Sequence, residues 1–324
     1  DVVTATYIIN ENHTLPVVSL VAEPSTLFGR NGIYTNYNWD KEVRCNMKLF
    51  DLDGGSFTID AGVKMHGHTG LKADKKSFKI NFRGRYGQDI LTYPVYGEDG
   101  PDVYDSLIVR AGQDYPFSIF RDELFTSLAR DISPELLAQR DKFSILYVNG
   151  QYYGIYCIKE AWTELMYAQK MGGSADNVEI VQAPVEDTHE IYALTRFCRN
   201  NDMTDDSNYA YVSSLVDIDN LIDYMMIQGY CTNGDVQQNL RYIRSKDTGY
   251  KWQLAFYDVM PTLLDYAGLD GSQYSLEAST PERCYDGISF KETLTGNDAE
   301  QEKHEFLYWE FHETNMMALR MGDW

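Results

Sequence analysis

Apolar and polar residues alternate through much of the first half of the chain, which is the pattern of β-strands with one buried face. The alternation is most regular at residues 56–67, where one face carries Phe57, Ile59, Ala61, Val63 and Met65. Shorter runs predict further strands at residues 15–24, 43–51, 77–82 and 105–112, and a turn with a short strand at 31–36. Residues 143–162 contain two apolar strands around Asn149-Gly150, a dipeptide typical of tight hairpin turns.

A different spacing predicts helices in four later segments. Residues 117–132 carry an apolar side chain at every fourth position, at Phe120, Leu124, Leu128 and Ile132. Acidic residues near the start of this helix are suited to pairing with a lysine from the strand before it. Residues 217–231 carry a second apolar stripe, which is predicted to be buried and consists of Ile218, Leu221, Ile222, Met225 and Met226. Shorter helices are predicted within 161–173 and 187–200.

Residues 230–258 contain three oxygen-bearing side chains that a hairpin is expected to bring together. Two predicted strands and the turn between them cover residues 240–244, 251–257 and 246–249. Because a hairpin returns the chain to its starting point, Asp235 and Asn239 before it are expected to lie near Asp258 after it. Two carboxylates and one amide suit Mg²⁺ and also suit phosphoryl transfer. The alternative is that both aspartates are ordinary turn and strand-end residues.

A loop containing Gly67 and Gly70 joins two of the predicted strands. The backbone N–H groups of such a loop approach phosphates closely, because no side chain intervenes. Lys75, Lys76 and Lys79 enter the following strand and are candidates to reach the phosphate charge. Lys79 lies on the polar face of that strand if its apolar residues face the core. The alternative is a plain hairpin whose lysines protect a sheet edge.

The charge balance excludes some classes of partner. The 324 residues include 28 Lys and Arg against 49 Asp and Glu, which makes the formal net charge −21. Nucleic acid is therefore not expected as a partner, because basic residues bind its phosphate backbone. A basic protein fits the negative charge of the chain better. No apolar run approaches the length of a membrane span. The five cysteines show no CxxC spacing and predict no metal site.

The order of the predicted elements is that of a protein kinase. A sheet with a glycine loop and a lysine strand is followed by a helix, a hairpin, a connector, further helices and the Asp/Asn/Asp hairpin. Kinases place a small sheet lobe before a helical lobe that carries the catalytic and metal-binding residues. The predicted fold is α+β and kinase-like, with two lobes, the smaller being an antiparallel sheet with one helix. The usual kinase fingerprints GxGxxG, HRD and DFG are absent.

Several separated motifs resemble the CotH kinase family, atypical kinase-like proteins first named from bacterial spore coats. They follow the order LPVVSLVAEP, IDAGVKMHGHTG, KKSFKINF, SLIVRAG, FRDELFTSLARDI, YVNGQYYGIYCIKE and NGDVQQNLRYIR. The resemblance covers residues 13–258 and implies a sheet lobe at 13–160 and a helical lobe at 161–258. It implies ATP-dependent phosphorylation of Ser or Thr in a protein substrate, with Mg²⁺ or Mn²⁺. It also implies a secreted or cell-surface protein, although the sequence from Asp1 shows no signal peptide.

The resemblance also implies roles for individual residues. Three of them correspond to the catalytic aspartate and the two metal-side residues of the family, namely Asp235, Asn239 and Asp258. Lys76 and Lys79 are both candidates for the phosphate-binding lysine, and Lys76 is the better match to the motif. Glu160, at the end of the second hairpin, corresponds to the glutamate on the hinge side. With Gly67 and Gly70, these residues form the expected ATP site.

The end of the chain departs from this family. Three segments within residues 255–324 resemble the C-terminal subdomain of sulfatases: YDVMPTLLDYAGL, DGISFKETLTGN and HEFLYWEFHETNMMALRMGDW. They predict a truncated large lobe followed by a small sulfatase-like α/β segment at 259–324, from which we expect no sulfatase chemistry. Two alternatives to an active kinase therefore stay open. One is a non-catalytic spore-coat or cell-surface protein on a kinase-like scaffold, and the other is an inactive sulfatase-related fusion.

Overall fold

The computed structural model describes most of the chain up to residue 256 and one hairpin near its end. The described residues are 5–98, 100–112, 120–133, 136–230, 236, 239–256, 306–311 and 316–321. The chain divides into two compact units, of which the first holds Asp1–Tyr230 and Asp235–Val259. The second unit holds Cys231–Gly234 and Met260–Trp324. Its described part is the antiparallel pair β14 (Phe306–Phe311) and β15 (Met316–Met321).

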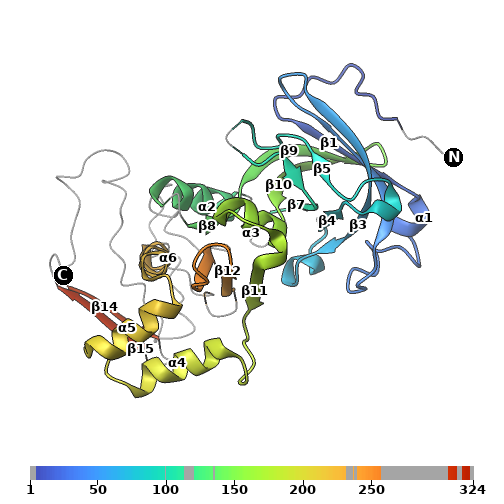
Figure 1. Cartoon of the computed structure of the whole chain (residues 1–324). Helices are drawn as coiled ribbons and strands as arrows, with labels where there is room; N and C mark the ends of the chain where they lie inside the picture. The colour runs from blue at the N-terminus through green and yellow to red at the C-terminus, as the bar shows by residue number, and fades with distance from the viewer. Residues whose placement is uncertain are drawn as a thin grey trace, which may run out of the picture. The chain divides into compact units, whose positions relative to one another are not determined.

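Seven strands of the first unit close into a barrel (Figure 1). Around the barrel they follow the order β1 (Val17–Ala22), β2 (Val43–Phe50), β3 (Ser56–His66), β4 (Ser77–Asn81), β7 (Ser106–Arg110), β10 (Gln151–Glu160) and β9 (Asp141–Val148). Neighbouring strands are antiparallel except at the closure, where β1 pairs with β9 in parallel. Closure removes the exposed edges that an open sheet has.

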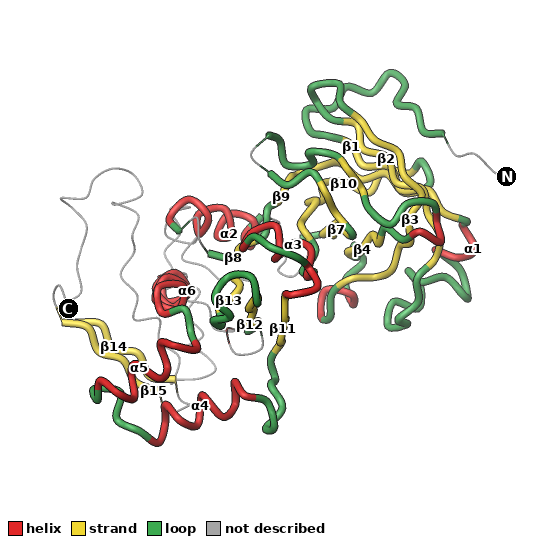
Figure 2. The backbone as a smooth tube through the Cα atoms, viewed as in Figure 1, coloured by secondary structure: helices red, strands yellow, loops and turns green. Residues whose placement is uncertain are grey.

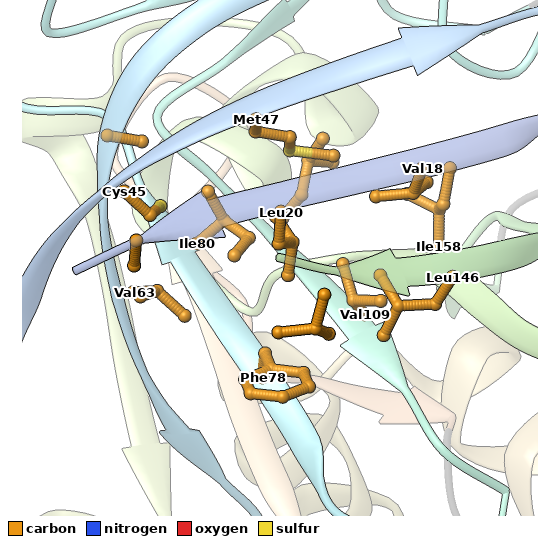
Figure 3. Packing of buried hydrophobic residues seen from close by; sticks show 14 of the residues in the cluster. Val18, Leu20, Cys45, Met47, Val63, Phe78, Ile80, Val109, Leu146 and Ile158 are labelled. Atoms are coloured by element: carbon orange, nitrogen blue, oxygen red, sulfur yellow. The ribbon is translucent and has the colours of Figure 1, made fainter. Parts of the chain in front are cut away.

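The barrel interior is filled by the apolar side chains whose alternation is visible in the sequence. Successive side chains of a strand face opposite sides, so Phe78 and Ile80 of β4 lie inside while Lys79 lies outside. Figure 3 labels ten residues of this core, each at most 2% exposed: Val18, Leu20, Cys45, Met47, Val63, Phe78, Ile80, Val109, Leu146 and Ile158. The period-two pattern of the sequence therefore decides which face of each strand is buried.

A second sheet of four strands belongs to the same unit. Its order is β11 (Val178–Gln182), β12 (Arg241–Ser245), β13 (Gln253–Phe256) and β8 (Leu137–Ala138). β12 and β13 pair antiparallel, which confirms the hairpin predicted between residues 240 and 257. Helix α3 (Glu164–Met171) covers this sheet, and its fully buried Tyr167 packs with Leu137 and Ile243 in a small second core.

The remaining elements are helices and short segments (Figure 2). They are α1 (Pro24–Leu27), α2 (Arg121–Ile132), α4 (Glu190–Asn200), α5 (Asp206–Leu215), α6 (Ile218–Tyr230), the 3-10 helices η1 (Thr69–Lys72), η2 (Gly84–Tyr86) and η3 (Ala175–Asn177), and the paired strands β5 (Leu91–Thr92) and β6 (Val103–Tyr104). None of the described helices is long and apolar enough to cross a lipid bilayer.

The α+β class is confirmed, as a large, mostly antiparallel sheet with several helices, and the structure adds one feature and corrects one expectation. The sheet closes into a barrel, which the strand pattern did not indicate. The short strand expected within residues 31–36 is a turn instead. Its backbone N–H groups at Ile33 and Tyr34 donate to the carbonyl oxygens of Thr26 and Leu27, which ties this segment to the loop around α1.

The apolar stripe predicted to be buried on α6 is largely exposed, and on α2 the apolar residues at every fourth position are not the buried face either. On α2, Phe120, Leu124 and Ile132 are 46%, 41% and 61% exposed. The buried face of this helix is instead mostly polar and consists of Asp122, Glu123, Phe125, Thr126 and Ala129. On α6, the buried side chains include Asn220, Tyr224, Ile227 and Gln228, while Ile222 and Met226 are exposed. Periodicity located both helices correctly, but specific polar contacts decided how each is rotated.

This rotation of α2 predicts different costs for two adjacent substitutions. Phe125→Ala removes a side chain that is 5% exposed and is expected to lower the free energy of unfolding by about 3 kcal/mol, because it leaves a cavity. Leu124→Ala changes a side chain that is 41% exposed, and its expected cost is within about 0.5 kcal/mol. Urea unfolding of both variants measures the difference. Equal costs would show that the apolar face of α2 is covered in solution.

Candidate functional site

The outer face of the barrel carries two rows of basic and polar side chains across β3, β4, β7 and β10. In the first row, Lys64 of β3 pairs in register with Lys79 of β4, which pairs with Ile108 of β7, which pairs with Lys159 of β10. Neighbouring strands lie about 4.8 Å apart, so this register sets the spacing of the row. Three of its four side chains are lysines, which is unusual for one row on a single sheet face of an acidic protein.

The second row lies two residues further along the same strands. It contains His66 of β3 in register with Ser77 of β4, and Arg110 of β7 in register with Cys157 of β10. Ser77 joins the two halves of this row, because its hydroxyl oxygen accepts the backbone N–H of Ala111 at 2.9 Å. His66 and Arg110 therefore face the same side of the barrel as Lys64 and Lys79.

The pKa of His66 responds to the positive charges around it. Its pKa is lowered to about 4, first by burial and then by the positive charges of Lys79, Arg241, Arg110 and Lys64, in that order. The pKa of Lys79 is also lowered, again mainly by burial, and Lys64 and Arg241 add to the effect while Asp105 opposes it. We call Lys64, His66, Lys79, Arg110 and Arg241 the cation patch. Carboxylates compensate part of this charge, since Nζ of Lys64 lies 2.7 Å from Oδ1 of Asp40 and Asp105 acts on Lys79. Desolvation and mutual repulsion still oppose the charged forms of the patch, and a bound anion would offset them.

Arg110 connects the cation patch to helix α2. Its Nη1 lies 3.2 Å from Oε1 of Glu123 and 4.0 Å from Oδ2 of Asp122. Lys159 of β10 reaches the same two acids: its ammonium group donates a hydrogen bond to Asp122 and lies 3.7 Å from Glu123. The desolvation of Lys159 is outweighed by these two carboxylates, which leave its pKa raised. The ion pair between Arg110 of β7 and Glu123 thus joins a basic residue on a strand to an acid on the helix that follows that strand.

Arg241 brings the second sheet to the cation patch. It is the first residue of β12 and lies over the ring of Trp162, with the guanidinium carbon 5.1 Å from the ring centroid. Trp162 is the second residue after β10 and stacks on Tyr167 of α3. Because Arg241 also acts on the pKa values of His66 and Lys79, the start of β12 lies beside the outer face of the barrel.

The structure separates the two lysines between which the sequence left the choice open. Lys79 belongs to the cation patch. Lys76 does not: it is 7% exposed, donates to the carbonyl oxygen of Ala73, and lies over the rings of Tyr37 and Tyr34 at 4.7 and 5.5 Å. The ammonium group of Lys76 therefore holds the loop before β4 together.

The predicted glycine loop lies next to the cation patch in the chain. Gly67 follows His66 directly and has a φ of 109°, a conformation that glycine adopts without strain. Gly70 lies in η1, where its carbonyl oxygen accepts the N–H of Ala73. The loop is thus a 3-10 turn closed by backbone hydrogen bonds and by the hydrogen bond that Lys76 donates to Ala73. Its first residue, Gly67, is adjacent in the chain to His66 of the cation patch.

Glu160 joins the barrel to α3. One of its oxygens accepts the backbone N–H of Arg140 at 2.7 Å and pairs with Nζ of Lys170 on α3 at 2.8 Å. The residue is 1% exposed, and its carbonyl oxygen accepts a hydrogen bond from Gln139. Its carboxylate therefore braces the end of β10 against α3.

Of the three residues predicted to have catalytic and metal-side roles, the structure describes one. Asn239 is described: its N–H donates to Val236 at 3.1 Å, and it lies two residues before Arg241 of the cation patch. Asp235 and Asp258 lie outside the described residues. Among the residues that the structure describes, no three His, Cys, Asp or Glu side chains form a group that would hold a metal ion.

Comparison with family models identifies the class of protein. Residues 63–301 match the model described as CotH kinase protein. The chain belongs to the CotH kinase family. The match contains every residue of the cation patch and all of the predicted site residues, and family membership implies a probable kinase that uses ATP and acts on protein substrates. A search of curated proteins finds no match.

The limits of this match differ from those expected from the sequence. It begins at residue 63 instead of residue 13, and it continues past Asp258 to residue 301, through much of the segment expected to resemble sulfatases. The expectation that this segment carries no sulfatase chemistry rested on the lack of a sulfatase nucleophile motif, and that premise was wrong. Residues 279–283, Ser-Thr-Pro-Glu-Arg, fit the Cys/Ser-x-Pro-x-Arg pattern of a sulfatase nucleophile, although they lie outside the described residues and inside the CotH match.

Five residues of the site were not singled out from the sequence: Lys64, His66, Arg110, Lys159 and Arg241. A signal for Arg110 was present, because SLIVR is an apolar strand that ends on a basic residue shortly before a helix with acids in its first turn. Lys159 was visible only as a strand-end residue beside Glu160. Arg241 had no local signal, since its place depends on how the second sheet meets the barrel.

The cation patch predicts that a bound polyanion changes the pKa of His66. Inorganic tripolyphosphate is expected to raise it from about 4 toward the ordinary value of about 6.5, because it offsets the surrounding positive charge. Titration of the His66 ring protons by NMR, with and without tripolyphosphate, measures the shift. Lys79→Gln should raise the pKa of unliganded His66 and reduce the response. An unchanged pKa at saturating tripolyphosphate would contradict an anion site here.

The same histidine predicts a contribution to acid sensitivity. Between pH 6.5 and about 4, the unfolded chain protonates this imidazole while the folded chain does not. The free energy of unfolding therefore falls as the pH is lowered through this window, by at most about 1.4 kcal/mol per pH unit. His66→Gln should lose this part of the dependence, as measured by urea unfolding at pH 7, 6, 5 and 4. Parallel curves for the two proteins would contradict the shifted pKa.

Proposed function

We propose that this chain is an atypical protein kinase that transfers the γ-phosphoryl group of ATP to Ser or Thr of a protein substrate. The barrel would serve as the sheet lobe, and the second sheet with its helices as the larger lobe. The observation that carries this proposal is the cation patch beside the Arg110–Glu123 ion pair. Both features lie within the residues that match the CotH kinase model.

The charge of the cation patch fits a triphosphate. The whole chain has a net charge of −21, yet four basic side chains lie close enough to His66 to lower its pKa. A nucleoside triphosphate brings several negative charges close together. A partly desolvated site strengthens the attraction between each phosphate charge and the basic side chains. Lys79 and Arg110 are the residues that we assign to the phosphates. Both belong to adjacent strands of one rigid sheet, which favours precise positioning.

The ion pair between Arg110 and Glu123 occupies the place of a conserved feature of protein kinases. In those enzymes a basic residue on a strand binds the phosphates and pairs with a glutamate on the following helix. Here β7 precedes α2, and the β9–β10 hairpin follows before the connector at Ala161. An arginine replaces the usual lysine at this place. Its planar guanidinium group is able to bind Glu123 and a phosphate oxygen at the same time.

We assign Asp235, Asn239 and Asp258 to the catalytic and metal-side roles. Asn239 lies two residues before Arg241, a chain length that spans at most about 7 Å, so its backbone is close to the cation patch. Asp258 follows the last described residue of β13 by two positions. A bound Mg²⁺ or Mn²⁺ would neutralise phosphate charge. Asp235 would accept the proton of the substrate hydroxyl, as the catalytic aspartate of kinases does.

The remaining predicted residues have supporting roles in this proposal. Gly67 would let the loop after β3 approach the phosphates, and Lys76 would keep that loop in one conformation through its contacts with Tyr34 and Tyr37. Glu160 would brace the connector on which the adenine is expected to rest. A basic acceptor protein suits the net charge of −21. Secretion or surface display is proposed from the family resemblance alone.

Phosphate transfer tests the proposal directly. The protein is incubated with γ-labelled ATP and Mg²⁺ or Mn²⁺, alone and with a basic acceptor protein. We expect label on Ser or Thr, and a loss of kcat of about 100-fold or more for Asp235→Ala, which removes the general base. Asp258→Ala should abolish transfer at Mg²⁺ or Mn²⁺ concentrations that support the wild type, because it removes a metal-side carboxylate. Lys142→Met, which breaks the ion pair of 2.6 Å between Lys142 on β9 and Asp51 after β2, is the control for general destabilisation.

Binding without transfer would select a non-catalytic scaffold instead. In that outcome ATP and Mg²⁺ raise the melting temperature of the wild-type protein, and no label is incorporated under any condition. If ATP and Mg²⁺ change neither the melting temperature nor the label, the kinase proposal is wrong.

A further inference from the structure

One end of strand β3 has a neighbouring strand on one side only, although the barrel as a whole is closed. β3 has 11 residues, whereas β4 beside it has 5. The pairing with β4 stops at Gly62, while the pairing with β2 continues to Ser56. Among the strands that the structure describes, residues 56–61 of β3 pair with β2 alone. We call these residues the free edge of β3.

The turn before β3 decides which backbone groups of the free edge point away from β2. The N–H of Asp51 donates to the carbonyl oxygen of Gly55 at 2.8 Å, so these two residues form a hydrogen-bonded pair of the hairpin. Bonded and non-bonded pairs alternate along an antiparallel ladder, and the pair at Thr58 lies three positions further along. The N–H and C=O of Thr58 therefore point away from β2, as do those of Ser56 and Asp60. Within the described chain, no residue hydrogen-bonds to these groups on that side.

A groove runs beside the free edge. Its volume is about 670 Å³, which is within the range of clefts that bind ligands. Residues 57–59 of β3 line one side of the groove, and residues 87–92 line the other. The side chains exposed along it are those of Thr58, Gln88, Asp89, Ile90 and Thr92. The unpaired backbone groups of β3 thus face open space between two segments of the chain.

The free edge has none of the usual protection against pairing with another chain. Proteins commonly blunt an exposed edge with lysine, proline or a bulge. Residues 56–61 contain neither Lys nor Pro, and they pair with β2 in an unbroken register. Aromatic and β-branched residues, which favour strands, occupy the centre of the edge at Phe57, Thr58 and Ile59. Such an edge is suited to take up an extended peptide as an additional strand through main-chain hydrogen bonds.

The side chains across the groove indicate the chemistry of that peptide. Ile90 is 42% exposed and offers an apolar contact. Asp89 is exposed beside it, and no described residue forms an ion pair with its carboxylate. A strand with a basic side chain near Asp89 and an apolar one near Ile90 complements these groups. The net charge of −21 also favours a basic partner and opposes a second copy of this acidic chain.

The free edge and the cation patch lie on the same strand. Thr58 and Lys64 are six positions apart, so their side chains face the same side of the barrel, which is the outside. At about 3.3 Å per residue, their separation along β3 is about 20 Å. A short extended stretch of an acceptor protein spans this distance. A segment docked at the free edge therefore leaves a nearby Ser or Thr within reach of the patch.

We propose that the groove beside the free edge of β3 is a docking site for an extended, basic segment of the acceptor protein, which pairs with Thr58 and Asp60 as an added strand. This inference rests on the proposed function in one respect, which is that the docked protein is the phosphate acceptor. The capacity to take up a strand follows from the unpaired backbone groups and the groove alone. The acceptor is thus selected by its backbone conformation and its charge, away from the phosphates.

Peptides with and without backbone donors test this site. The probe is a short peptide of alternating Val and Lys that contains one Ser. Its two controls carry N-methyl groups on alternate amides, one control for each edge of the peptide strand. We expect the unmodified peptide to slow hydrogen exchange at the amides of Thr58 and Asp60 by about tenfold or more. One N-methylated peptide should bind at least about tenfold more weakly, because it has lost the donors that pair with β3. Equal binding of all three peptides would overturn the proposal.

Substitutions in the groove test the same site from the side of the protein. Thr58→Pro removes an N–H that points into the groove and spares the donors that pair with β2. We expect it to weaken peptide binding by about tenfold, whereas Thr58→Val keeps the N–H and should bind within about twofold of wild type. Asp89→Lys should weaken binding of the Val/Lys peptide and strengthen binding of a Val/Glu peptide, each by about fivefold.

Two controls keep this test decisive. Tripolyphosphate affinity should be unchanged in all three variants, because the cation patch is not altered. If Thr58→Pro does not fold, as its melting curve would show, Asp89→Lys and the N-methylated peptides decide the question. An absence of effect in both would contradict the docking site.

The outcomes also separate this inference from the proposed function. If the peptide protects Thr58 and Asp60 but no acceptor is phosphorylated, the strand site stands and the kinase proposal fails. If the peptide is phosphorylated with the same KM by the wild type and by Thr58→Pro, the kinase stands and the docking site fails. Protection of these amides that rises with protein concentration, without peptide, would identify a second copy as the occupant and overturn the proposal.

Discussion

The ion pairing between helix α2 and strands β7 and β10 is the interaction on which the rest of the described site depends. It reverses the rotation of the helix that apolar periodicity indicates, and it buries Asp122 and Glu123 in place of Leu124 and Ile132. Burial of two carboxylates is unfavourable unless bases compensate for them. The barrel supplies these bases from two adjacent strands, so the position of the helix and the position of Arg110 are set together.

The cation patch concentrates positive charge in a strongly acidic protein. Lys64 and Lys79 are neighbours in register on β3 and β4, and Arg241 approaches from a different sheet. Repulsion among these groups, added to burial, is what depresses the pKa values of His66 and Lys79. Such an arrangement costs stability in the absence of a compensating anion, and sites that bind phosphate commonly carry this cost. The patch lies on a closed barrel, whose continuous hydrogen bonding gives it a rigid base.

Lys76 and Lys79 are both candidates for the phosphate-binding lysine from the sequence, but the structure gives them different contacts. They are three positions apart, and both follow the glycine loop. Lys79 faces the outside of β4, where the register places it beside Lys64 and Ile108. Lys76 precedes the strand and is enclosed by two tyrosine rings. Its charge is therefore used within the loop, and the loop is held in shape by the same contact.

The sequence determined the elements whose signal is local. Alternation predicted the strands around Ile59, Phe78 and Val109, and turn residues predicted the hairpins at Asn149-Gly150 and near Gly249, because these patterns depend only on neighbouring residues. The order of the motifs indicated the CotH family. Tertiary structure alone decided the closure of the barrel, the rotation of α2, and the placement of Arg241 over Trp162. The reason is physical: strand register, ion pairing and desolvation couple residues far apart in the chain, and no local pattern records which of them will meet.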